Sequence, residues 1–73
     1  MFSFKEGWLA RDEDGTLWVF VEKPYKDTRE RRMRWDSDGL YEQVEKDDET
    51  EETRKISWED PEPTHVKFKF EII

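Results

Sequence analysis

The residues of this chain that could perform nucleophilic or acid–base chemistry are few and poorly placed. A nucleophile–base system needs a hydroxyl or thiol beside a histidine that a carboxylate orients. The chain has no cysteine and a single histidine, His65, on the polar side of an alternating stretch near the C-terminus. Paired carboxylates abound, but acid–base catalysis requires one of them to be desolvated in a pocket. A chain of 73 residues has little room for such a pocket, so we expect no enzyme and no catalytic residues.

The segment that comes nearest to a metal-binding loop is Asp12-Glu13-Asp14-Gly15. An EF-hand loop needs acids at alternating positions and a glutamate at its twelfth position. Ala10 and Val21 stand where the first and last of those ligands would be. The lack of cysteine also removes thiolate metal sites and disulfides. We therefore expect no specific metal site and no cofactor.

Basic residues are interleaved with aromatic ones between residues 25 and 35. In single-strand-binding proteins, basic groups follow the phosphate backbone while bases stack on aromatic rings. The candidates for these roles are Arg29, Arg31, Arg32, Arg34 and Trp35. The net charge of −7 would repel a polyanion, and arginine stems often cover apolar surface with their charged ends in water. Weak binding of single-stranded nucleic acid is thus an alternative hypothesis.

A second charged block, residues 42–52, is acidic and could act as a decoy. Its acids could mimic phosphates and occupy the basic groove of a host protein; the candidates are Asp47, Asp48, Glu49, Glu51 and Glu52. Such a mimic needs carboxylates at fixed spacing, whereas residues 46–55 contain no apolar residue and predict a long, flexible, exposed loop. Charge runs are most often solvated surface, and we expect the basic and acidic blocks to neutralise each other in part.

The aromatic content favours a third class, a binding module without chemistry. Four tryptophans and two tyrosines cannot all be enclosed in so small a core, and both residue types are enriched at interface hot spots. Trp18, Phe20 and Trp58 are the candidates for an exposed aromatic patch or a homodimer seam. The leading hypothesis is a noncatalytic protein-binding module whose partner is a host protein or a second copy of the chain, and no small-molecule substrate is evident.

The elements that would position these residues start with a hairpin over residues 7–24. Two apolar stretches flank an acidic turn in which Gly15 suits a type I turn followed by a residue with positive φ. Residues 17–21, LWVFV, are apolar on both sides, which predicts a central strand. Pro24 lacks an amide donor and should end that strand.

Two further elements follow in the chain. Residues 33–36 and 40–45 predict a second hairpin through a turn at Ser37-Asp38-Gly39. Residues 65–72 alternate strictly, with Val66, Phe68, Phe70 and Ile72 on the apolar side, and predict one half-buried strand that pairs with the first hairpin. The sequence thus predicts an all-β single domain over 1–73, an antiparallel meander or partly open barrel of about five strands, with a flexible acidic loop at 46–55.

The first hairpin and the stretch around Trp58 also carry a resemblance to a known family. The matching residues are Gly7-Trp8, Ala10-Arg11-Asp12, Asp14-Gly15, Leu17, Phe20, Glu22-Lys23-Pro24, Trp35 and Trp58-Glu59-Asp60. This pattern resembles an uncharacterised family of short proteins from gut anaerobic bacteria and their phages or mobile elements. The resemblance implies a shared small β fold and a mobile-element origin, and it implies no reaction.

Targeting segments are not evident in the sequence. The N-terminal MFSFKEGW lacks the apolar core of roughly 7–15 residues that a signal peptide needs. No run approaches the roughly 20 apolar residues that span a bilayer. We expect a cytoplasmic protein without a membrane contact.

Overall fold

The first hairpin forms the centre of the main sheet. The structure is a computed structural model that describes residues 5–67 and 70–73. Strand β1 (Glu6–Arg11) pairs antiparallel with β2 (Leu17–Phe20). Gly15 turns the chain with a φ of 95°, which glycine adopts without steric cost, and the carboxylate of Asp14 accepts a hydrogen bond from the Thr16 amide at 2.9 Å. The predicted hairpin and its turn are confirmed.

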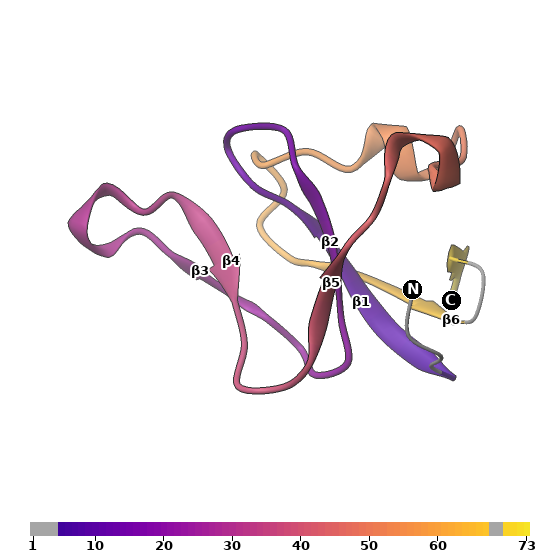
Figure 1. Ribbon diagram of the computed structural model, residues 1–73, viewed down its shortest axis with the longest axis horizontal. Helices are drawn as coiled ribbons and strands as arrows, with labels where there is room; N and C mark the ends of the chain where they lie inside the picture. The colour runs from indigo at the N-terminus through magenta and orange to yellow at the C-terminus, as the bar shows by residue number, and fades with distance from the viewer. Residues whose placement is uncertain (1–4, 68–69) are drawn as a thin grey trace.

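The strands of the main sheet follow the order β5-β2-β1-β6-β7, and the neighbours pair antiparallel. Strand β5 (Tyr41–Gln43) lies beside β2, strand β6 (Thr64–Lys67) lies beside β1, and β7 (Glu71–Ile72) pairs with β6. Strand β2 is therefore a central strand, as its two-sided apolar sequence predicts. Over the part of the chain that the structure describes, β5 and β7 end the sheet, so it is open at both edges (Figure 1). The protein is a small all-β domain.

Strands β3 (Tyr25–Asp27) and β4 (Arg34–Asp36) form a separate two-stranded arm that projects from the sheet (Figure 1). The short 3-10 turn η1 (Arg29–Arg31) lies at its tip. The predicted hairpin between residues 33–36 and 40–45 is wrong, because β4 pairs back to β3 while β5 pairs with β2. Beside β2, the chain after β5 buries Val44 in the core. Pairing with the charged strand β4 would leave that apolar side chain outside.

The predicted C-terminal strand is divided into two. Strand β6 ends at Lys67, and β7 folds back on it so that Ile72 lies opposite Val66. Phe70 has a left-handed φ of 62°, which turns the chain and places its side chain in the core. A single strand over residues 65–72 is therefore wrong, whereas its pairing beside the first hairpin is confirmed by the β1–β6 ladder. The positions of Phe68 and Lys69 lie outside the described residues.

Each face of the main sheet carries its own apolar set, because side chains alternate along every strand. One set is aliphatic apart from a single phenylalanine, and we call this side the aliphatic face: Leu9, Leu17, Val19, Val44, Ile56, Val66 and Phe70. Residues paired directly across strands share a face, and those pairs define the aromatic face: Trp8, Trp18, Phe20, Tyr41 and His65. The arm places Trp35 on the aromatic face, beside Ala10 and Phe20. The domain thus has two small cores instead of one.

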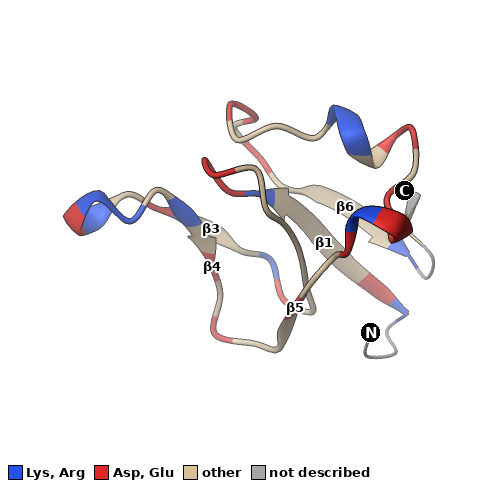
Figure 2. Ribbon diagram, turned by 45° about the horizontal axis from the view of Figure 1, so that its top comes forward, with Lys and Arg blue, Asp and Glu red and all other residues tan. Residues whose placement is uncertain are grey.

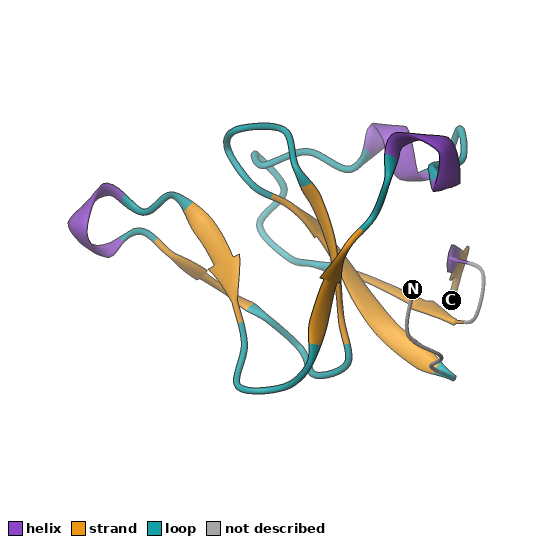
Figure 3. Cartoon of the chain, viewed as in Figure 1, coloured by secondary structure: helices purple, strands orange, loops and turns teal. Residues whose placement is uncertain are grey.

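The acidic segment forms two short 3-10 turns, η2 (Lys46–Asp48) and η3 (Thr53–Lys55) (Figure 3). Figure 2 shows that the acids of η2 lie far from the basic tip of the arm. The Thr50 amide donates to Thr53 Oγ1 at 2.8 Å, and Thr53 is fully buried. Residues 46–48, 50–52, 54 and 55 are exposed, as predicted for this loop, but Thr53 is an exception. It can be buried because it satisfies its polar atoms locally.

Candidate functional site

A small pocket of about 180 Å³ opens where the arm meets the aromatic face. Trp18 and Tyr41, on neighbouring strands of the main sheet, meet edge to face with their ring centroids 5.6 Å apart. Phe20 is buried beside them, and its ring lies 5.8 Å from that of Tyr41. The pocket is lined by Asp12, Trp18, Phe20, Arg34, Trp35, Asp36 and Tyr41. We call it the aromatic pocket.

Trp35 fixes the arm against the sheet and so forms one wall of the aromatic pocket. Its backbone amide donates to Asp12 Oδ1 at 2.8 Å, and its indole nitrogen donates to the carbonyl of Arg11 at 3.1 Å. Its side chain is buried against Ala10 and Phe20. Because an aromatic side chain with its polar atom satisfied packs firmly, the pocket has a preformed wall.

The charges in the aromatic pocket are two carboxylates and one guanidinium. Arg34 lies 3.8 Å from Asp36 and makes an ion pair with it. Burial raises the pKa of Asp12, against the opposing effect of the hydrogen bond from the Trp35 amide. Within residues 5–67 and 70–73, no cationic side chain makes an ion pair with Asp12. Asp12 therefore brings a carboxylate without a direct ion pair to the aromatic pocket, and Arg34 attracts it only from a longer distance.

Lysine side chains of the chain itself already cover three of the four tryptophans. The Lys26 ammonium lies 4.4 Å from the Trp58 ring centroid and 5.4 Å from that of Trp35, and it donates to the Trp58 carbonyl at 2.6 Å. Lys23 lies 5.6 Å from the Trp8 ring. These are cation–π distances. Trp18 has no such cation among the described residues, so its ring is open to one from outside.

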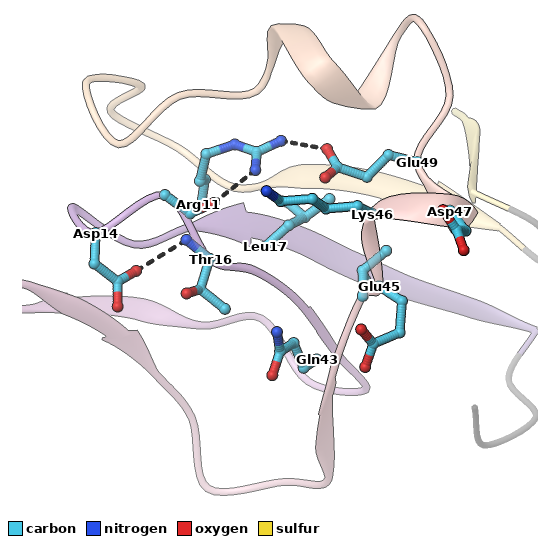
Figure 4. A pocket seen from close by; sticks show the side chains of 11 residues that line it. Arg11, Asp14, Thr16, Leu17, Gln43, Glu45, Lys46, Asp47 and Glu49 are labelled. Atoms are coloured by element: carbon cyan, nitrogen blue, oxygen red, sulfur yellow. Dashed lines mark hydrogen bonds and ion pairs between the residues drawn. The ribbon is translucent and has the colours of Figure 1, made fainter.

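A larger hollow of about 520 Å³ lies at the other end of β2, and its arginine, Arg11, is used inside the protein. The Arg11 guanidinium there binds Glu49 at 2.6 Å (Figure 4). It also donates to the carbonyls of Ile56, Gly15 and Thr53. Four hydrogen bonds leave this side chain little capacity for a ligand. We conclude that Arg11 fastens the acidic segment to the sheet.

The arginines at the tip of the arm are held mainly by one buried aspartate. Asp27 is fully shielded from solvent and pairs with Arg29 at 3.1 Å and Arg32 at 3.6 Å. The hydrogen bond from Arg29 lowers the pKa of Asp27 and outweighs the effect of burial. Glu30, Arg31 and Met33 all have positive φ, a conformation that costs non-glycine residues about 1–2 kcal/mol each. Asp27 thus pairs with two arginines of a tip whose backbone is locally strained.

The predicted protein-binding residues are partly brought together. Trp18 and Phe20 both line the aromatic pocket, but Phe20 is only 2% exposed and cannot belong to an exposed patch. Trp58 is half-buried and covered by Lys26. In the acidic set Asp47, Asp48, Glu51 and Glu52 are exposed, while Glu49 is held by Arg11. The buried Phe20 and the paired Glu49 are corrections to the predicted surface.

The predicted nucleic-acid residues do not form one stacking surface. Trp35 is buried, so its ring is not available for a base, which corrects that prediction. Arg29 and Arg32 pair with Asp27, Arg34 pairs with Asp36, and Arg31 is exposed at the tip. The three carboxylates of the arm, Asp27, Glu30 and Asp36, also offset part of its positive charge.

Sequence reasoning missed Asp12, Asp36 and Tyr41 as pocket residues. In the turn, Asp12 points to the Trp35 amide and Asp14 to the Thr16 amide, so these carboxylates serve two different segments. Within the described ranges, no three acids or histidines converge as metal ligands would. No sequence motif predicts the aromatic pocket, because it forms where the two-stranded arm meets the main sheet.

Comparisons with protein-family models, with curated protein sequences and with solved structures give no match to this chain. Among the residues that the structure describes, no helix is long and apolar enough to cross a membrane.

Proposed function

We propose that the protein is a noncatalytic binding module that receives a basic side chain of a partner protein in the aromatic pocket. The observation that carries the proposal is the ring of Trp18, which no cation of the chain covers, beside the carboxylate of Asp12, which makes no ion pair among the described residues. Aromatic faces attract cations, and the attraction grows when the cation is partly desolvated. With the mobile-element origin that the resemblance implies, the partner would be a host protein.

The charge of the whole chain supports the same class of partner. A net charge of −7 attracts basic surfaces and speeds their encounter. The lysines over Trp8, Trp35 and Trp58 give an internal example of the contact that we propose for Trp18. An external lysine or arginine would complete the pattern.

The proposal is tested with three blocked hexapeptides that differ at one central position, where they carry trimethyllysine, lysine or norleucine in a serine–threonine background. Affinity is measured by calorimetry or tryptophan fluorescence. A cation–π contact of about 0.5–2 kcal/mol predicts that lysine and trimethyllysine bind roughly 2–30 times more tightly than norleucine. Equal affinity for the lysine and norleucine peptides would contradict the proposal.

Two matched variants locate the effect. Trp18→Leu should abolish the preference for the cationic peptides, because it removes the uncovered ring. Trp8→Leu changes another half-buried tryptophan of the aromatic face, one that Lys23 already covers, and should leave the preference intact. Circular dichroism of both variants checks that the fold is retained.

A second candidate function, the acidic decoy, is favoured by one observation. Carboxylates must be held at fixed spacing to mimic phosphates, and Arg11 together with the Thr50–Thr53 hydrogen bonds fastens the segment that carries them. Replacing the four exposed acids with serine tests this function: Asp47, Asp48, Glu51 and Glu52. Loss of affinity for a cationic polymer such as polylysine, with the peptide preference unchanged, would support the decoy; unchanged polylysine binding would exclude it.

A further inference from the structure

The outer edge of β5 is an unpaired strand edge beside the aromatic pocket. Strand β5 pairs with β2 on one side, and no described strand pairs with it on the other. In Figure 1 β5 lies in the foreground, and no other ribbon crosses in front of it. Tyr41, one of its three residues, lines the pocket. A segment that followed this edge would therefore pass the pocket.

The hydrogen bonds between β5 and β2 show which backbone groups point outward. The Val21 amide donates to the Leu40 carbonyl at 3.0 Å, and the Val44 amide donates to the Leu17 carbonyl at 2.9 Å. Hydrogen-bonded and non-hydrogen-bonded pairs alternate along an antiparallel ladder. The pairs next to these two bonds, Phe20–Tyr41 and Trp18–Gln43, are therefore of the non-hydrogen-bonded kind. The amide and carbonyl groups of Tyr41 and Gln43 consequently face away from β2, toward the free edge.

We propose that the partner segment binds as an extended antiparallel strand along the outer edge of β5 and inserts its basic side chain into the aromatic pocket. This inference rests on the proposed function and adds the binding mode to it. Side chains directly opposite each other lie on one face of a sheet, so the residue that pairs with Tyr41 points toward the side on which the pocket opens. Strand addition of this kind obtains affinity from main-chain bonds and specificity from side-chain pockets.

Charge favours a basic partner over a second copy of the chain as the occupant. Residues 41–48 carry four acids and one lysine: Glu42, Glu45, Asp47, Asp48 and Lys46. Two β5 strands placed side by side would bring these acids together, whereas a basic segment would neutralise them. Leu40 and Tyr41 are 71% and 54% exposed, which gives the added strand an apolar contact as well.

The test uses the lysine hexapeptide and two versions of it with one methylated backbone nitrogen. In the proposed register the lysine exchanges both hydrogen bonds with Tyr41, so a methyl group on the lysine backbone nitrogen removes one bond and blocks close approach. A methyl group on the next residue points away from β5. We expect the first methylation to weaken binding about tenfold, because it removes one hydrogen bond and keeps the strands apart, and the second to have little effect.

Amide hydrogen exchange of the protein gives the second measurement. Saturation with the lysine peptide should slow exchange at Tyr41 and Gln43 at least several-fold. The variant Gln43→Pro removes an outward amide without touching the bonds to β2, and it should weaken binding, while Gln43→Thr serves as the matched control.

The outcomes separate the two proposals. If the peptide binds and Trp18 responds, but exchange at Tyr41 and Gln43 is unchanged and both methylated peptides bind equally, strand addition is overturned and the proposed function stands. If the lysine peptide shows no preference over norleucine, both proposals fail. If these two amides are protected without peptide in a concentration-dependent dimer, a second copy occupies the edge and the inference is overturned.

Discussion

The aliphatic and aromatic faces of the sheet come from alternate residues of the same strands, yet only one of them is closed. In β2, the side chains of Leu17 and Val19 are buried, whereas Trp18 on the other face of the sheet is partly exposed. The difference lies in how each covering segment is fastened. Arg11 makes three hydrogen bonds, to Glu49, Thr53 and Ile56, that bring the acidic segment under the aliphatic face, while the arm covers its face mainly through Trp35. An incompletely closed face leaves a pocket.

The largest expected effect is a difference in stability between substitutions on the aliphatic face and on the aromatic face. Leu17→Ala opens a cavity in the closed aliphatic core and should lower the free energy of unfolding by about 2–5 kcal/mol. Trp18→Leu, one residue away on the open face, should cost far less, about 1 kcal/mol. Urea denaturation of both variants measures the difference, and equal losses would mean that the aromatic face is as closed as the aliphatic one.

The next largest loss in the free energy of unfolding is expected when the acidic segment is released from the sheet. Arg11→Met removes the charge partner of Glu49 and leaves buried carbonyls without donors, so we expect a loss of about 2–4 kcal/mol. Glu49→Gln keeps the shape and a hydrogen-bond acceptor and should cost less. Thermal unfolding gives the order, and a smaller loss for Arg11→Met than for Glu49→Gln would refute the role assigned to Arg11.

The tip of the arm should respond to acid before the sheet does. The folded pKa of Asp27 is lowered, so its stabilising contribution is complete above its unfolded pKa of about 3.9 and is lost as the pH falls through the lower folded value. Amide resonances of residues 27–32 should therefore shift below pH 4 while those of β1 hold. In Asp27→Asn that acid transition should be missing; its persistence would assign it to another group.

The smallest effect concerns Asp12 and has the opposite sign. Its folded pKa is raised, so its contribution to stability is complete below the unfolded value of about 3.9 and is lost as the pH rises through the folded value. Over the same interval its carboxylate ionises and the affinity for the lysine peptide should rise. Calorimetric titrations of the parent and Asp12→Asn at several pH values check this, and the same pH slope in both would exclude Asp12 as the counter-ion.

The local parts of this fold are readable from the sequence. The turn at Gly15 and the apolar run of β2 specify the first hairpin through neighbouring residues alone. The partner of β5 is not local: β5 follows the arm in the chain, but the hydrophobic gain lies beside β2. The pairing of β5 with β2 competes with the hairpin that the turn at residues 37–39 would form between β4 and β5. Only the packing of the folded domain decides between the two pairings.

The candidate site is less readable still. Trp18 and Phe20 are equivalent in the alternation of β2 and both line the aromatic pocket, yet Trp18 is partly exposed and Phe20 is buried, because Trp35 covers only part of the face. In the sequence, Arg11 is a polar residue at the end of a predicted strand. Its hydrogen bond to Glu49, 38 residues away, could not be predicted from its neighbours in the chain. These assignments depend on how separate segments meet, which pattern and composition do not encode.

The most direct test of the account is the response of the four indole N–H resonances during titration with the lysine peptide. We predict that the Trp18 signal moves most and that the signals of Trp8 and Trp58 move little, because lysines of the chain cover their rings. The norleucine peptide should need a higher concentration than the lysine peptide to move the Trp18 signal equally. A Trp18 signal that stays in place while the lysine peptide binds would contradict the claim that the open aromatic face is the binding site.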